Sequence, residues 1–287
     1  MMNRRRFISV SAAMLVAPPA HAAPLRWSGH AMGAEVHLTL HNGTDEDLKA
    51  AIAEIASMEK TFSVFDSSSE LSQINAAGGG LISDEMSKLL HICDDFHGLT
   101  NGFFDPTIQP VFHALMSGET SPWELVGWDR VKLSNDRVKL GRQQALSLNG
   151  IAQGFVTDRI SSLLRDRGYT KALVSVGEHA AIGGPFRLSL EDPHFGSVGI
   201  RTLNDRAIAT SSPGAMVVSG ETHIFDPEQR IKPRWSTVSV EANTATTADG
   251  LSTAFCLMSR EEIAEVVDQT GIKATLVDAV GDLEVVG

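Results

Sequence analysis

Residues 172–210 read ALVSVGEHAAIGGPFRLSLEDPHFGSVGIRTLNDRAIAT. Short apolar runs alternate here with glycine, proline, asparagine and aspartate, a pattern typical of strands joined by tight turns. We interpret the stretch VGEHAAIGG within it as a glycine-rich turn. Strands are predicted at residues 36–40, 172–176, 186–190, 197–200, 207–210, 215–219, 237–241, 274–279 and 283–286.

Helical periodicity dominates the first half of the chain. Apolar residues recur at spacings of three and four from Leu48 to Phe62, behind a start at Thr44-x-x-Asp47. Helices are predicted there, at residues 83–97, 151–167 and 260–270, and around Asp249, with a hairpin at 131–140. Helices early and strands late predict an α+β fold, a single domain whose mostly antiparallel sheet packs against helices. No G-x-G-x-x-G sequence follows the first strand, so a doubly wound dinucleotide-binding fold is not expected.

The first 22 residues have the composition of an export signal. Arginines at positions 4–6 precede a short apolar run, and Ala20-His21-Ala22 offers a small-residue cleavage site. Paired arginines are typical of twin-arginine signals. We expect residues 1–22 to be removed and residues 23–287 to act in the periplasm. The apolar run is too short to span a bilayer, and no membrane span is expected in the mature chain.

Charge narrows the range of partners. Because residues 1–22 contain three arginines and no acidic residue, their removal changes the formal net charge from −11 to −14. So acidic a chain repels nucleic acid, and nucleic acid is not expected as a partner. The two cysteines, Cys93 and Cys256, lie in apolar helical patterns and are interpreted as buried free thiols.

Two stretches have the composition of a phosphate and metal site. TTADGLST, at residues 246–253, places Asp249, Ser252 and Thr253 at helical offsets of three and four. On a helix their oxygens share one face, which we expect to be open to a hard cation. LNGIAQGFVTD, at residues 148–158, supplies Gly150 and Gly154, where the backbone can approach a pyrophosphate. The alternatives are an ordinary helix start with Thr246 or Thr247 as N-cap, and close packing of a helix on a strand at the glycines.

Seven motifs follow one another along the chain, and together they resemble the ApbE family of FAD:protein FMN transferases from about Met32 to the end of the last helix. The motifs are AMGAEV (31–36), SVFDSSSELSQIN (63–75), GFFDPTIQPV (102–111), LNGIAQGFVTD (148–158), VSVGEHAAIGG (174–184), THIFDP (222–227) and ADGLSTAF (248–255). The resemblance implies an enzyme that uses FAD and Mg²⁺, moves FMN to a threonine or serine hydroxyl of a client protein, and releases AMP.

The resemblance also implies roles for particular residues. The Mg²⁺ ligands would be Asp249, Ser252, Thr253 and the Gly150 carbonyl, and His223 would be the general base. The alternative for His223 is a structural hydrogen bond to Asp226. Residues implied to contact FAD are Met32, Phe65, Phe103, Phe104, Asp105, Ser147, Gln153 and Ile224.

Some positions depart from the family pattern, and other functions stay open. Gln153 stands where lysine or glutamate is usual, Ser147 where aspartate is usual, and Glu178-His179 where Gly-Asn or Gly-Asp is common. An FAD pyrophosphatase that uses water as acceptor is one alternative function, and a non-catalytic periplasmic flavin carrier or assembly factor is another. By analogy, the client would be a flavoprotein domain of a membrane redox complex.

Overall fold

Eight antiparallel strands form the central sheet in the computed structural model, which describes residues 23–218, 220–229 and 231–287. Across the sheet the strands are β1 (Leu25–Ala31), β2 (Ala34–Leu40), β6 (Ala172–Val176), β7 (Glu178–Ile182), β10 (Ala207–Ser211), β13 (Thr237–Ala242), β14 (Lys273–Val277) and β15 (Leu283–Val286). Every neighbouring pair runs antiparallel. The prediction of an α+β fold with a mostly antiparallel sheet is confirmed.

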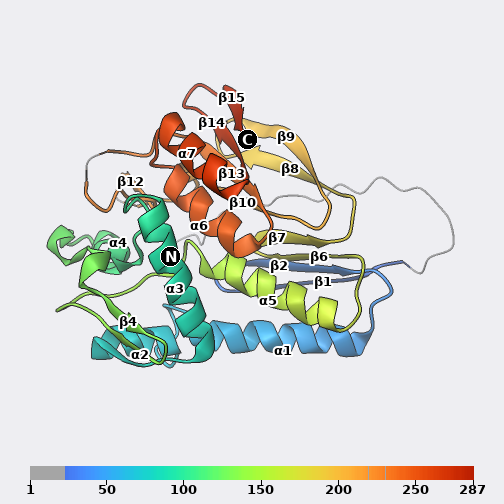
Figure 1. The fold of residues 1–287 in the computed structure, drawn as a ribbon, viewed down its shortest axis with the longest axis horizontal. Helices are drawn as coiled ribbons and strands as arrows, with labels where there is room; N and C mark the ends of the chain where they lie inside the picture. The colour runs from blue at the N-terminus through green and yellow to red at the C-terminus, as the bar shows by residue number, and fades with distance from the viewer. Residues whose placement is uncertain (1–22, 219, 230) are drawn as a thin grey trace.

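Helices cover one face of this sheet (Figure 1). α5 (Ala152–Asp166) packs on β6 and β7, α6 (Ala245–Phe255) packs on β10 and β13, and α1 (Asp45–Phe62) lies against α5. The apolar side of α6, with Ala248, Leu251 and Phe255, is completely buried. α7 (Arg260–Thr270) covers β14 and β15. Burial of these apolar stripes holds α5 and α6 firmly on the sheet.

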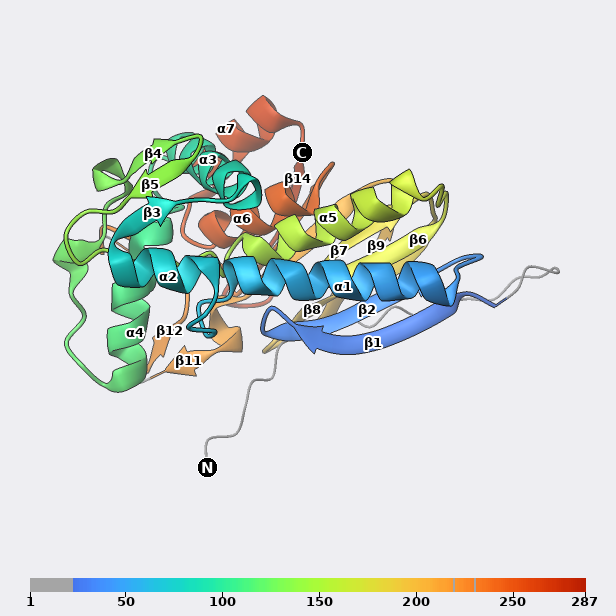
Figure 2. The same cartoon turned by 90° about the horizontal axis from the view of Figure 1, so that it is seen from below.

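A second, smaller core lies on the opposite face of the sheet. The hairpin of β8 (Phe186–Asp192) and β9 (Gly196–Leu203) packs its leucines on Leu173 and Ile208 of the sheet. The helical corner seen from below in Figure 2 holds the remaining elements. They are α2 (Glu70–Ala77), α3 (Asp84–Leu99), α4 (Gln109–Ser117), the small sheet of β3 (Gly79–Leu81), β4 (Lys132–Ser134) and β5 (Arg137–Lys139), and the ribbon of β11 (Val217–Val218) and β12 (Glu221–Thr222).

Most predicted elements occur within a few residues of the expected positions, but β7 was missed. The stretch VGEHAAIGG is not one turn: Glu178–Ile182 form a strand inside the sheet. Glycines at 177 and 183 both have positive φ and make the turns at its two ends. Tertiary pairing on both sides therefore makes a strand of a segment with little β-propensity of its own.

Other predictions need smaller corrections. Of the predicted strand at 215–219, Ala215 ends the 3-10 turn Pro213–Ala215, and Val217–Val218 form the short strand β11. β1, α2 and α4 were not predicted. Thr244, rather than Thr246 or Thr247, caps α6 by accepting from the Thr247 N–H. Cys93 and Cys256 are buried free thiols, as expected.

The sequence also predicted a signal peptide and no membrane span in the mature chain. The predicted signal peptide at residues 1–22 lies outside the described residues. Within the described part of the chain, no helix combines the length and apolar character that crossing a bilayer requires.

Candidate functional site

The contact between α5 and α6 depends on Gly154. A side chain at this position would overlap the Ala245 carbonyl oxygen and the Asp249 side chain. Because glycine leaves the space free, the Gly154 N–H donates to Asp249 Oδ2 over 2.8 Å. Gly154 therefore packs a helix on a helix rather than on a strand, and it joins the two sequence stretches expected to form the site.

Asp158 of α5 fixes the start of α6. Its carboxylate accepts from the Ala245 and Thr246 N–H groups, each over 2.8 Å, and from the Thr246 hydroxyl over 2.6 Å. These contacts satisfy the first amides of α6 and place a negative charge at the positive end of the helix. Burial nevertheless raises the pKa of Asp158, against the lowering effect of the bonds from Thr246 and Ala245.

Oxygen atoms from three segments meet beside the second half of α6. The Thr253 hydroxyl lies 3.4 Å from the Gly150 carbonyl oxygen, to which it donates. The Ser211 hydroxyl, at the end of β10, lies 2.8 Å from Ser252 Oγ and 3.4 Å from Thr253 Oγ1. We call these groups, together with the Asp249 carboxylate, the oxygen cluster. It contains the four predicted metal ligands, with Asp249 one helical turn before Ser252 and Thr253, and adds Ser211, which was not predicted.

The expectation that this face of α6 is open is wrong for two of its three side chains. Asp249 is 3% exposed and Ser252 is fully buried, whereas Thr253 is half-buried. The reason is the close approach of α5 at Gly154, which covers the carboxylate. Across the described ranges, no three side chains of histidine, cysteine, aspartate or glutamate gather in a possible metal site. A cation here would thus depend on hydroxyl and carbonyl oxygens as well as on Asp249.

The charged forms of two carboxyl groups, those of Asp249 and Glu178, are destabilised by their surroundings. Burial raises the pKa of Asp249 to about 7; the Gly154 N–H opposes this shift and the charge of Asp158 adds to it. Burial, followed by the charge of Asp249, raises the pKa of Glu178 well above its ordinary value. Desolvated carboxylates favour a cation or a proton as partner. The donor set is made of hard oxygens, which fits Mg²⁺.

His223 follows β12 and is half-buried. Its Nδ1 atom lies 3.2 Å from the Pro213 carbonyl oxygen and 3.3 Å from that of Met216. Because carbonyls only accept, Nδ1 carries the proton and Nε2 presents a lone pair. Burial lowers the pKa of His223, although these two bonds act in the opposite direction. The ring is neutral at pH 7 and is tied to the segment that directly follows Ser211.

The alternative role for His223 was a structural hydrogen bond to Asp226, but the hydrogen bonds shown for its ring go to other groups. Asp226, the alternative partner, accepts from the backbone N–H groups of Glu228 and Ile231 over 3.1 and 3.0 Å. Ile224 is buried, and its carbonyl accepts from the Thr222 hydroxyl over 3.1 Å. Asp226 thus organises its own turn, while the imidazole is oriented by backbone carbonyls.

Met32 occupies a strained turn between β1 and β2. Its φ of 53° lies in the left-handed region, which is costly for a side chain other than glycine. Two side chains hold the turn: Glu59 Oε1 accepts from the Met32 N–H over 2.9 Å, and Gln153 Nε2 donates to the Met32 carbonyl over 3.0 Å. Gln153, which is expected to contact FAD, also supports Met32 in this way, and Glu59 was not predicted.

The expected ring-contacting residues fall into two groups. Phe65 is 62% exposed, whereas Phe103 and Phe104 are buried and Phe104 packs edge-to-face on Phe96. Asp105 Oδ1 accepts from the N–H and hydroxyl of Thr107, and Oδ2 accepts from the Trp128 N–H. Asp105 is therefore first a structural acceptor, with little capacity left for a ligand.

A cavity of about 410 Å³ adjoins these residues. Its walls include Asp105, Trp128, His97 and Pro227. It thus joins the segment 102–111 to the segment 222–227. The Ser147 N–H donates to the Pro106 carbonyl over 2.7 Å, which ties the loop before Gly150 to the same wall. The cavity has room for part of a dinucleotide.

Comparison with known proteins identifies the family of this chain. The family model described as "ApbE family" matches residues 32–276. The chain belongs to the ApbE family. Among curated proteins, it is 23% identical to the FAD:protein FMN transferase of Haemophilus influenzae, covering 87% of this chain and 85% of that protein. It is also 23% identical to the protein of the same name from Vibrio cholerae, covering 75% and 74%.

Solved structures of this family share the fold. The apo flavinyl transferase ApbE of Pseudomonas stutzeri superposes with a TM-score of 0.82 at 22% identity, covering 94% of this chain and 96% of that one. The flavin transferase ApbE of Vibrio cholerae gives a TM-score of 0.79 at 21% identity, with 92% and 97% covered. The family expected from the seven motifs is therefore confirmed.

Proposed function

We propose that this chain is an FAD:protein FMN transferase that uses Mg²⁺. It moves the FMN part of FAD to a threonine or serine hydroxyl of a client flavoprotein and releases AMP. The names of the curated relatives support the flavin transfer. The single observation that carries the proposal is the oxygen cluster, in which the Thr253 hydroxyl contacts the Gly150 carbonyl and Asp249 and Ser252 lie on the same side of α6.

The donor set supports a role for Mg²⁺. Asp249, Ser252, Thr253 and the Gly150 carbonyl would hold the ion, all through hard oxygen atoms. When bound, Mg²⁺ supplies positive charge that neutralises the pyrophosphate and stabilises the leaving AMP oxygen. The buried Asp249 carboxyl supports this assignment, because a carboxylate removed from water is stabilised by a bound cation.

His223 is the proposed general base. Its Nδ1 proton is engaged by the Pro213 and Met216 carbonyls, so Nε2 is left to accept the proton of the client hydroxyl. The hydroxyl oxygen forms a bond to the FMN phosphorus while the bond from that phosphorus to the AMP oxygen breaks. AMP leaves with the electron pair of that bond, and the proton stays on Nε2 until it passes to solvent.

The flavin would lie between the Met32 turn and the cavity beside Asp105. Met32 and the exposed Phe65 offer apolar contact to a flat ring, and Phe103 and Phe104 support the wall behind it. Ser147 and Ile224 flank this region from the loops at 147–150 and 222–227. Gln153 contributes by holding Met32 in its strained conformation.

One experiment tests this function against both alternatives. The mature protein is incubated with FAD, Mg²⁺ and a client flavin domain, and the products are examined on a denaturing gel for flavin fluorescence and by chromatography for AMP. A fluorescent client band with matching AMP supports transfer. AMP and FMN formed equally well without the client would identify a pyrophosphatase. FAD binding without either product would identify a carrier.

The proposed location is the periplasm. The twin arginines and the cleavage site at Ala20-His21-Ala22 support export, after which a membrane redox complex would supply the client domain. Replacing Arg4, Arg5 and Arg6 by lysine should retain the precursor in the cytoplasm. Normal export of that variant would exclude a twin-arginine signal.

A further inference from the structure

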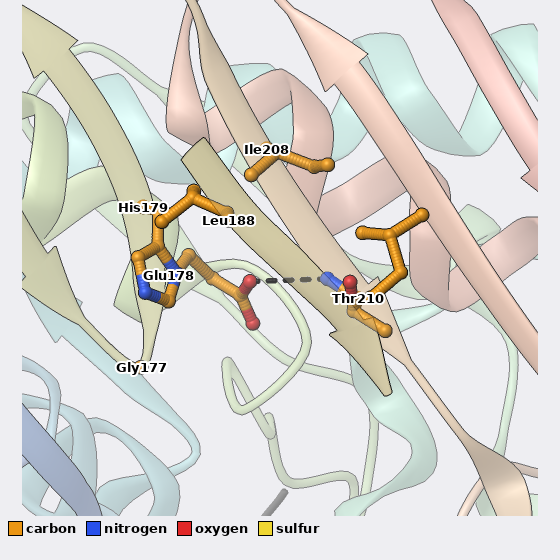
Figure 3. Close-up of a pocket in the computed structure, with 7 residues that line it drawn as sticks. Gly177, Glu178, His179, Leu188, Ile208 and Thr210 are labelled. Atoms are coloured by element: carbon orange, nitrogen blue, oxygen red, sulfur yellow. Dashed lines mark hydrogen bonds between the residues drawn. The ribbon is translucent and has the colours of Figure 1, made fainter. Parts of the chain in front are cut away.

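The pairing of β7 with β10 stops one residue short of Glu178. Ala180 pairs with Ala207 and His179 pairs with Ile208, and the ladder ends there. The Thr210 N–H, beyond the end of the ladder, donates instead to Glu178 Oε2 over 3.1 Å. Figure 3 shows this bond, with the second carboxylate oxygen directed away from it. One oxygen of Glu178 thus holds β10, while the other has no part in that bond.

Strand alternation places Glu178 on the same face of the sheet as α6. Ala180, two residues further along β7, packs against Ala207 and against Ala245, the first residue of α6. Glu178 shares this face because side chains two apart in a strand point the same way. On β10 the same face carries Ser211, four residues from Ala207, whose hydroxyl touches Ser252 and Thr253. Glu178 therefore projects to the same side of the sheet as Ser211, on which the oxygen cluster lies.

Electrostatics agrees with this geometry. Besides burial, the charge of Asp249 raises the pKa of Glu178, so the two carboxyl groups are close enough to interact. In the described chain no lysine, arginine or histidine forms an ion pair with either group. A buried acid, Asp249, and a half-buried one, Glu178, lie on adjoining elements without a basic side chain to balance them, which provides a favourable location for a divalent cation.

We propose that Glu178 is a further carboxylate of the cation site, which supplies it with a second negative charge beside Asp249. The inference rests on the proposed function, since it assigns a residue to the same site. Its second effect is to position Ser211, because the bond to Thr210 fixes the end of β10 next to that hydroxyl. Charge count in a site sets cation affinity, so Glu178 should tighten binding of the metal itself, apart from catalysis.

The test uses Mn²⁺ as the probe, because electron paramagnetic resonance counts free Mn²⁺ directly. The metal-stripped mature protein is titrated as wild type, Glu178→Gln and Glu178→Asp. Glutamine keeps an oxygen for the Thr210 N–H and removes only the charge, so Kd for Mn²⁺ should rise by at least about 10-fold. Aspartate keeps the charge and should bind more tightly than glutamine. The matched control is Glu35→Gln, an exposed glutamate on β2 that changes the net charge equally and should leave Kd unchanged.

The outcomes separate this inference from the proposed function. If wild type binds no Mn²⁺, the metal site of the proposed function fails as a whole. If wild type binds and Glu178→Gln binds with the same Kd, Glu178 only holds β10 and the inference is overturned. Near-ultraviolet circular dichroism reports whether each variant keeps its fold. Should Glu178→Gln unfold, Glu178→Ala takes its place, since it also removes the charge. A folded Glu178→Ala with a Kd within twofold of wild type would likewise overturn the assignment.

Discussion

The α5–α6 junction and the segments that carry Met32, Phe65 and His223 serve one proposed substrate but are built in different ways. At the junction, side chains are buried, the approach of the two helices depends on Gly154, and Asp158 satisfies the first amides of α6. The other region consists of turns and loops, where Met32 and His223 are half-buried and Phe65 is exposed. The rigid region can preorganise charge, whereas the loops can admit a ring and a client chain.

The largest expected effect comes from Asp249→Asn. Asparagine keeps an oxygen that accepts from the Gly154 N–H, so the helix contact persists, but the anion is lost. Transfer should fall by roughly 10³-fold or more, since an uncompensated phosphate charge then remains in the transition state. Flavin fluorescence of the client band measures the rate. Asp268→Asn, on the exposed side of α7, is the control, and full activity of Asp249→Asn would reduce this residue to a helix contact.

The same variant should change how the free energy of unfolding depends on pH. Burial raises the pKa of Asp249 to about 7 from an ordinary value of 3.8, so the folded protein binds a proton there more tightly than the unfolded chain. The resulting stability is complete below pH 4 and is lost as the pH rises to about 7. In EDTA at pH 8, the free energy of unfolding of Asp249→Asn should therefore exceed that of wild type by on the order of 2–4 kcal/mol, and its melting temperature should be higher. The two should converge toward pH 4, and a constant gap in thermal scans would contradict the buried carboxyl.

His223→Ala tests the loop region. Transfer should slow by roughly 10²- to 10⁴-fold while FAD binding persists, because only the proton acceptor is removed. Since burial keeps the pKa of His223 below its ordinary value, the wild-type rate should be independent of His223 titration above neutral pH and fall in acid. The deficit of the variant should narrow at alkaline pH, where hydroxide replaces the base. The control is His113→Ala, an exposed histidine of α4.

A deficit of His223→Ala that stays constant with pH, together with a lower melting temperature, would contradict base catalysis. His223 would then only support the turn that follows β10 through the Pro213 and Met216 carbonyls. Mn²⁺ affinity offers a further distinction between the two regions. It should be unchanged in His223→Ala, because the oxygen cluster does not include this ring.

Gly154→Ala probes how closely the rigid region is packed. The added methyl group would overlap the Ala245 carbonyl, so the helices must separate at a cost of about 1–3 kcal/mol. Gly98→Ala is the matched control, since it lies near the end of α3 with no atom within 4 Å of the new methyl group. It should be neutral or stabilise by up to about 1 kcal/mol. Equal melting temperatures for the two variants would mean that the close contact at Gly154 does not contribute to stability.

How far the sequence predicts this site also differs between its parts. Helical spacing is sufficient to put Asp249, Ser252 and Thr253 on one side of α6, and the structure places the Gly150 carbonyl against Thr253. Spacing within one helix cannot say what covers that side, and for this reason the buried state of Asp249 was not predicted. The cover comes from α5, a different segment, through the missing side chain of Gly154.

Residues missed by the sequence analysis reach the site through tertiary contacts. Ser211 contributes because β10 ends beside α6, and no local pattern distinguishes its hydroxyl from that of Ser212. Glu178 was assigned to a turn, since glycines flank the short strand that carries it. Asp158 stands within the motif LNGIAQGFVTD, where an acid two turns from Gly150 was a usable signal. Strand order decides the positions of Ser211 and Glu178, and the packing of α5 on α6 decides that of Asp158. Sequence periodicity encodes neither.

The smallest expected effect connects the two regions. Gln153 starts on the rigid helix α5 and donates to the carbonyl of Met32, whose φ of 53° must be held against relaxation. Gln153→Ala removes one hydrogen bond, worth about 1 kcal/mol, and lets the strained turn relax. KM for FAD should therefore rise roughly 3- to 10-fold with little change in kcat, because the oxygen cluster and His223 are untouched. Gln269→Ala, exposed on α7, is the control. A fall in kcat at constant KM would instead mean that Gln153 acts at the phosphate, and the division between a rigid charge site and a pliable ring site would no longer hold.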